Sequence, residues 1–210
     1  MAWATPSRVT LVPKTLHNSR RQPGTPIRIV VTGSECTGKT TLAQTLARYL
    51  DCPWSPEAAR EYLARKRSAL TAADVEPIAR QQIAEEDLAL AQADRLMVLD
   101  TDLVSTLVYA RHYYGEYPQW IAQAARTRSG DLYLLCDIDL PWVADGPQRD
   151  RASPAARSAI HALFVATLDQ ARLSWLLVRG QGKQRTQQAL AAVHQHLVES
   201  GDVDNDIPAE

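Results

Sequence analysis

The sequence predicts an α/β fold of three layers, in which a central parallel sheet of about five strands lies between helices and carries a lid at one edge. Short apolar runs alternate along the chain with longer segments whose apolar residues recur at helical spacing. The short runs are almost continuously apolar, as in strands that helices cover on both faces. Glycine or an acid directly follows several of these runs, at the edge where parallel sheets bind ligands.

Four runs are clear strands and one is weaker. The clear strands are expected at 27–32, 96–99, 132–136 and 175–178, and a short one fits around Cys52 to Trp54. Helices are expected at 41–50, from Pro56 to Leu63, from Thr71 (with Asp74 in a capping-box position) towards Ala93, and at 103–114, 118–127, 154–172 and 183–199. A loop rich in glycine, proline and charge at 139–153 predicts the lid.

Length and composition suit one domain. The 210 residues divide into a flexible leader at 1–26, a domain at 27–199 and an acidic tail at 200–210. A net charge of -1 argues against a dedicated nucleic-acid binder, and no apolar run approaches the ~18 residues that span a membrane. Three cysteines without a CxxC pair indicate a reducing compartment, hence the cytoplasm. Oligomeric state stays open, a homo-oligomer included.

A phosphate-binding loop joins the first strand to the first helix. The segment GSECTGKT at 33–40 satisfies G-x-x-x-x-G-K-[ST] and has the strand and helix that this motif requires on its two sides. Glycines allow the backbone N–H groups to surround phosphate oxygens, Lys39 adds charge for the β- and γ-phosphates, and the Thr40 hydroxyl is a ligand for Mg²⁺. The sequence thus predicts a P-loop NTPase fold that uses ATP and Mg²⁺. The residues expected to bind the nucleotide are Gly33, Ser34, Glu35, Cys36, Thr37, Gly38, Lys39, Thr40 and Thr41.

Two acids follow the strand at 96–99. Asp100 stands where a Walker-B carboxylate holds Mg²⁺. Asp102 faces the same side if the extended backbone continues, and it then aligns the acceptor; a helix cap is the other interpretation.

Glu57 is a further candidate acid, and Arg60 follows it at i,i+3 spacing. Small P-loop kinases place an acid at this edge to orient or deprotonate the acceptor hydroxyl, and both residues are candidate substrate contacts. A solvated first-turn Glu with an i,i+3 Arg fits the same spacing.

The predicted lid offers further candidates. Arg149 and Arg151 could neutralise charge on the transferring phosphoryl group, or they are surface charges. Trp142 could stack on a flat substrate ring or anchor the loop, and Asp145 is a candidate substrate contact. Arg185 follows the last strand, where a nucleotide base normally lies, and is a candidate for cofactor binding.

The chain resembles the ribosylnicotinamide (nicotinamide riboside) kinase domain of bacterial NAD-biosynthesis regulators, in the P-loop ATPase/kinase group. The resemblance covers about 27–199. It rests on the segments GSECTGKTTLA (33–43), PEAAREYL (56–63), LDTD (99–102) and, most specifically, DLYLLCDIDLPWVADGPQRD (131–150). It implies transfer of phosphate from ATP·Mg²⁺ to the 5′-hydroxyl of the nucleoside, a small-molecule partner, to give nicotinamide mononucleotide.

Carried over residue by residue, the resemblance implies a division of roles. Lys39 and Thr40 would serve the phosphates and the metal, Asp100 the metal, Asp102 and Glu57 the acceptor, and Arg149 and Arg151 the lid. The family's regulators also carry a nucleotidyltransferase domain and often a helix-turn-helix, for which 26 leading residues leave no room, so adenylyl transfer and repression are expected to be absent. The pair Pro147–Gln148, directly before Arg149, departs from the family's pattern.

Two other functions share these features. Another P-loop nucleoside or nucleotide kinase would have the same phosphate loop and differ only in its acceptor pocket. A regulatory ATPase would use nucleotide binding to switch a partner surface, although paired acids and lid arginines are what phosphoryl transfer needs.

Overall fold

A computed structural model describes residues 24–141 and 154–202. Nearly all of the predicted leader and tail, and the predicted lid from residue 142 to 153, lie outside the described residues.

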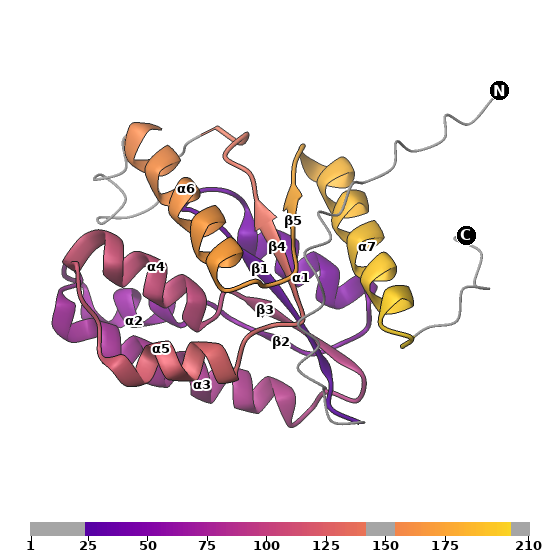
Figure 1. The fold of residues 1–210 in the computed structure, drawn as a ribbon, viewed down its shortest axis with the longest axis horizontal. Coiled ribbons are helices and arrows are strands. Elements are labelled where there is room, and N and C mark those ends of the chain that lie inside the picture. Colours follow the sequence, from indigo (N-terminus) through magenta and orange to yellow (C-terminus); the bar gives the residue numbers. More distant parts are fainter. Residues whose placement is uncertain (1–23, 142–153, 203–210) are drawn as a thin grey trace.

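The core of the molecule is a parallel five-stranded sheet in the order β2-β3-β1-β4-β5 (Figure 1). The strands are β1 (Ile27–Thr32), β2 (Trp54–Ser55), β3 (Leu96–Asp100), β4 (Leu132–Cys136) and β5 (Trp175–Val178). The central strand β1 pairs with β3 on one side and β4 on the other, so that Val31 stands in register with Asp100 and with Leu134. Because all strands run the same way, their carboxyl ends meet at one edge, which is where such sheets bind ligands.

Helices cover both faces of this sheet (Figure 1). One face carries α1 (Lys39–Tyr49) and α7 (Gly182–Glu199), and the other carries α3 (Val75–Leu90), α4 (Leu103–Tyr114), α5 (Gln119–Thr127) and α6 (Pro154–Gln170). Successive strand residues alternate between the two cores: Val98 packs on the first side, and Met97 and Leu99 pack on the second. The predicted three-layer α/β fold is therefore confirmed.

The segment after β2 differs slightly from its prediction. Helix α2 (Ala58–Lys66) begins two residues after Pro56, and Glu57 precedes it in an extended conformation. The Ala58 N–H, which no helical carbonyl can accept, donates to Oε1 of buried Gln82 at 3.1 Å. A side chain from α3 therefore fixes the point at which α2 starts.

The long helix predicted from Thr71 begins with a short 3₁₀ turn, η1 (Ala72–Asp74), before α3. The Asp74 carboxylate accepts the Thr71 N–H at 2.7 Å and the Thr71 hydroxyl at 2.8 Å. Asp74 thus holds this helix start as the capping-box spacing predicts.

Across residues 24–141 and 154–202, no helix is both long enough and apolar enough to cross a lipid bilayer.

Candidate active site

The loop between β1 and α1 is held in shape by its own polar groups. The carbonyl of Ser34 accepts the Thr37 hydroxyl at 2.8 Å and the Lys39 ammonium at 3.0 Å. Gly33 lies at φ 135, and a Cβ there would come within 2.9 Å of the Cys136 carbonyl oxygen. Glycine is therefore required where the loop passes the end of β4. The loop therefore has the concave backbone at a helix N-terminus that is typical of phosphate-binding sites.

Two buried arginines donate hydrogen bonds to this loop. Arg157 of α6 donates to the Cys36 carbonyl at 3.1 Å and to the Leu140 carbonyl at 2.8 Å. Arg185 of α7 donates to the Thr37 carbonyl and forms an ion pair with Asp139. Both guanidinium groups thus hold loop carbonyls in place.

These contacts refine the predictions for the arginines. Arg185 lies against the phosphate loop, as a nucleotide-site residue should, but its described bonds hold protein groups. Sequence reasoning missed Arg157, whose only signal was a basic residue in the first turn of a helix after a charged loop.

Asp100 ends β3 as a fully buried carboxylate. Neither of its oxygens makes a hydrogen bond within 3.5 Å to any described residue. Burial and then the Glu57 carboxylate raise the pKa of Asp100 to about 6, against the opposing effects of the Thr40 hydroxyl and the Lys39 ammonium. The site therefore brings the Asp100 carboxylate close to the Thr40 hydroxyl and the Glu57 carboxylate, which are hard oxygen donors of the kind that suits Mg²⁺.

A magnesium site here would take only some of its ligands from the described residues. The parts of the chain that the structure describes contain no group of three or more His, Cys, Asp or Glu side chains placed to hold a metal. A site made of Thr40, Asp100, phosphate oxygens and water fits this finding, because Mg²⁺ usually keeps several waters and few carboxylates.

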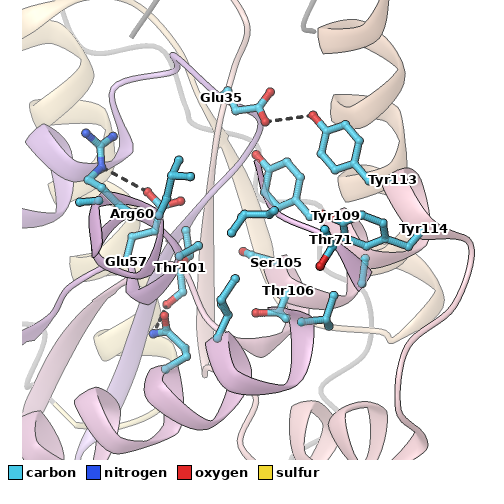
Figure 2. Close-up of a pocket in the computed structure, with 18 of the residues that line it drawn as sticks. Glu35, Glu57, Arg60, Thr71, Thr101, Ser105, Thr106, Tyr109, Tyr113 and Tyr114 are labelled. Atoms are coloured by element: carbon cyan, nitrogen blue, oxygen red, sulfur yellow. Dashed lines mark hydrogen bonds and ion pairs between the residues drawn. The ribbon is translucent and has the colours of Figure 1, made fainter. Parts of the chain in front are cut away.

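A cavity of about 540 Å³ opens beside the loop, between α2, α3 and α4 (Figure 2). Glu57 and Arg60 line one wall and form an ion pair at 3.7 Å. Apolar side chains of Leu63, Val75 and Ile78 line a further part of the cavity. Glu57 and Arg60 thus lie on the cavity wall, and their pairing is the i,i+3 contact that the competing interpretation described. Their role as substrate contacts stays a prediction.

Tyrosines of α4 form another wall of this cavity (Figure 2). The rings of Tyr109 and Tyr113 are nearly parallel, with centroids 6.2 Å apart, and Tyr114 lies beside them. The Tyr113 hydroxyl donates to Oε1 of Glu35 at 3.1 Å. Sequence reasoning missed these residues, although an i,i+4 tyrosine pair on the helix after Asp100 was a usable signal.

Asp102 does not face the cavity, contrary to the prediction. Its Oδ1 accepts the N–H groups of Val104 at 3.0 Å and Ser105 at 3.3 Å, and its Oδ2 accepts the Tyr133 hydroxyl at 2.6 Å. The alternation argument failed because Thr101 lies at φ 70 and ends the extended backbone. Asp102 is the helix cap that the competing interpretation described.

We expect Asp102→Asn to leave the KM for the acceptor within about threefold of wild type. Asp102→Ala should instead lower the free energy of unfolding by about 2 kcal/mol, because it removes the cap and strands the Tyr133 hydroxyl. Steady-state kinetics and denaturant titration measure the two effects. A large rise in acceptor KM for the asparagine variant at unchanged stability would return Asp102 to the site.

The remaining predicted residues divide into two groups. Thr40 lies in the first turn of α1, and Thr41 is exposed beside it. The candidates of the predicted lid, Trp142, Asp145, Arg149 and Arg151, lie outside the described residues.

A family model described as an AAA domain matches residues 28–185. The chain belongs to this family. The match runs from β1 to the start of α7 and so includes the phosphate loop, Asp100 and the cavity residues.

Two curated relatives are similar to this chain. The trifunctional NAD biosynthesis/regulator proteins NadR of Salmonella typhimurium and Escherichia coli are 28% identical over 155 and 154 residues, or 72% and 71% of this chain. These matches confirm the resemblance to the NAD-biosynthesis regulators. The chain spans only 38% and 37% of the lengths of these relatives.

Solved structures show the same fold. A NadR protein in complex with NR superposes with a TM-score of 0.65 at 23% identity, covering 89% of this chain and 54% of the other. A NadR protein with NAD and AMP-PNP gives the same TM-score at 24% identity, over 89% and 51%. Thymidylate kinase from Ehrlichia chaffeensis gives 0.61 at 16% identity, over 82% of this chain and 99% of the other.

Proposed function

We propose that this protein transfers the γ-phosphoryl group of ATP to the 5′-hydroxyl of nicotinamide riboside and releases nicotinamide mononucleotide. The observation that carries the proposal is the cavity of about 540 Å³ that adjoins the phosphate loop and bears the Glu57 carboxylate. Such a cavity gives a flat nucleoside a place beside the nucleotide. The NadR relatives, one solved with NR and another with AMP-PNP, support the same substrates.

The loop and its lysine act on the phosphates. The N–H groups from Gly33 to Thr40 bind phosphate oxygens, and the Lys39 ammonium stabilises the negative charge that develops on the phosphoryl group during transfer. Thr40 and Asp100 would hold Mg²⁺, which neutralises the phosphate charge when bound. The supporting arginines on the loop carbonyls keep these donors preorganised.

Glu57 acts on the acceptor. Its carboxylate stands at the cavity wall and is close enough to Asp100 to raise the pKa of that acid. We assign to Glu57 the alignment of the 5′-hydroxyl and acceptance of its proton. Arg60 holds Glu57 in place through their ion pair.

The lid and the compartment complete the proposal. Arg149 and Arg151 would neutralise the transferring group, and Trp142 and Asp145 would contact the nucleoside. Cys52 and Cys136 are free thiols, which favours the reducing cytoplasm as the compartment.

A coupled ATPase assay over an acceptor panel tests this function. The panel holds nicotinamide riboside, common ribo- and deoxyribonucleosides and thymidine monophosphate, and mass spectrometry identifies the products. We expect nicotinamide riboside to give at least about tenfold higher kcat/KM than any other acceptor, with one phosphate added per ATP consumed. Phosphorylation of a different acceptor would identify another nucleoside or nucleotide kinase, and turnover that no acceptor stimulates would identify a regulatory ATPase.

A further inference from the structure

Glu35 belongs to the phosphate loop by sequence but to the cavity by the position of its side chain. Figure 2 shows its carboxylate pointing towards the tyrosines of α4. Oε1 accepts the Tyr113 hydroxyl at 3.1 Å, while Oε2 is buried and has no hydrogen-bond partner among the described residues. A buried acceptor without a donor costs free energy, and a ligand that donates to it recovers that cost.

This carboxylate does not suit the phosphates of ATP. It is negative and accepts hydrogen bonds only, so it would repel phosphate oxygens. That Glu35 binds the nucleotide through its backbone in the loop stays a prediction, and its side chain lines the cavity instead.

The place of Glu35 along the loop indicates which part of the acceptor it meets. It follows Ser34, whose carbonyl accepts the Lys39 ammonium, so it stands next to the phosphoryl-binding position. A reacting acceptor oxygen must approach the phosphorus to about 3–3.5 Å. The sugar that carries this oxygen then lies beside Glu35, and the flat ring extends towards the apolar wall of Leu63, Val75 and Ile78.

We propose that Oε2 of Glu35 accepts a hydrogen bond from a secondary hydroxyl of the acceptor sugar, and that this bond makes the enzyme select ribosides over deoxyribosides. The inference rests on the proposed function for the identity of the acceptor. Bonds from a hydroxyl to a carboxylate are short and stronger than neutral ones. Tyr113 is a positioning residue, because its hydroxyl fixes the orientation of the carboxylate.

The test compares nicotinamide riboside with its 2′-deoxy and 3′-deoxy analogues in wild type and in Glu35→Gln. Wild type should prefer the riboside over at least one analogue by about 30-fold or more in kcat/KM, the range of a hydrogen bond to a charged group. Glu35→Gln should lower that preference about tenfold and leave the KM for ATP within about threefold. The analogue that shows the larger preference identifies the hydroxyl.

Two further variants separate recognition from a general disturbance of the loop. Tyr113→Phe should lower the preference by a smaller factor, because the carboxylate stays but loses its fixed orientation. Glu76→Gln removes an equal charge from an exposed ion pair with Arg80, outside the cavity, and should leave the preference unchanged. An unchanged preference in Glu35→Gln, or equal losses on all acceptors with a raised ATP KM, would overturn the inference.

Failure of the proposed function gives a different result. If the wild type phosphorylates another nucleoside, the same riboside and deoxyriboside comparison is made on that nucleoside, and Glu35→Gln again decides. If no acceptor is phosphorylated, the proposed kinase function is refuted. Calorimetric binding of nicotinamide riboside and its deoxy analogues to wild type and Glu35→Gln then tests the contact alone, and equal affinities would refute it.

Discussion

Lys39→Met is expected to lower kcat by more than about 100-fold while the fold persists. The Lys39 ammonium is nearly buried and its described bond is to the Ser34 carbonyl at the mouth of the loop, where charge develops during transfer. Removing one preorganised donor to such charge costs about 10²–10³ in rate. Methionine keeps the length of the aliphatic stem, so packing against the loop changes little.

Arg48→Met provides the matched control. Arg48 lies on the same helix as Lys39, and its described bonds are long ones to Gln44 and Thr45 on the exposed side. The Arg48→Met variant loses one positive charge at a site that does not contact the loop, and it should keep the wild-type kcat. Circular dichroism and melting curves without nucleotide should be alike for all three proteins, within a few degrees. Retention of more than a tenth of wild-type turnover by Lys39→Met would refute the assignment of the phosphate loop.

Much of the fold is predictable because its signals are local. The strands at 132–136 and 175–178 and the helix at 103–114 agree with the structure at both ends. A continuous apolar run or a helical spacing of apolar residues can be recognised within a short segment. Strands that alternate with helices then predict a parallel sheet. The start of α2 was harder to predict from the sequence, because the oxygen that accepts the Ala58 N–H belongs to Gln82, 24 residues away.

The site is predictable where a motif fixes backbone geometry and less so where side-chain direction decides. The phosphate loop and Asp100 lie at the edge that the motif and the strand end require. Asp102 turned inward because one residue, Thr101, adopts a positive φ that no β-branched residue would be expected to adopt. Glu35 turned towards Tyr113, a partner 78 residues away, and no local pattern records such a contact.

The buried acid at the end of β3 is expected to cost stability and to provide function. Asp100→Asn should remove most of the activity, with at least a 100-fold loss of kcat at ordinary Mg²⁺ and a higher Mg²⁺ concentration for half-maximal rate. In the absence of metal it should also raise the free energy of unfolding by about 1–2 kcal/mol at pH 7.5. The stabilisation arises because the variant no longer carries an unpartnered buried charge beside Glu57.

The pH dependence of this stabilisation has a definite sign. Burial raises the pKa of Asp100 from 3.8 to about 6, so the folded state binds a proton that the unfolded state releases. The contribution of this proton to stability is complete below about pH 4 and is lost as the pH rises through 6. Asparagine has no such titration, so the advantage of the variant should be small at pH 4, grow up to about pH 6.5 and then level off.

Denaturant titrations in EDTA across this pH range measure the effect, with Asp94→Asn as an exposed control that precedes the same strand. Addition of Mg²⁺ and ATP should reverse the order of stability, because only wild type gains the full binding free energy of the metal–nucleotide complex. An Asp100→Asn variant that is less stable than wild type in EDTA at pH 7.5 would mean that the carboxylate has a structural partner. Wild-type dependence on Mg²⁺ in that variant would mean that the metal is held elsewhere.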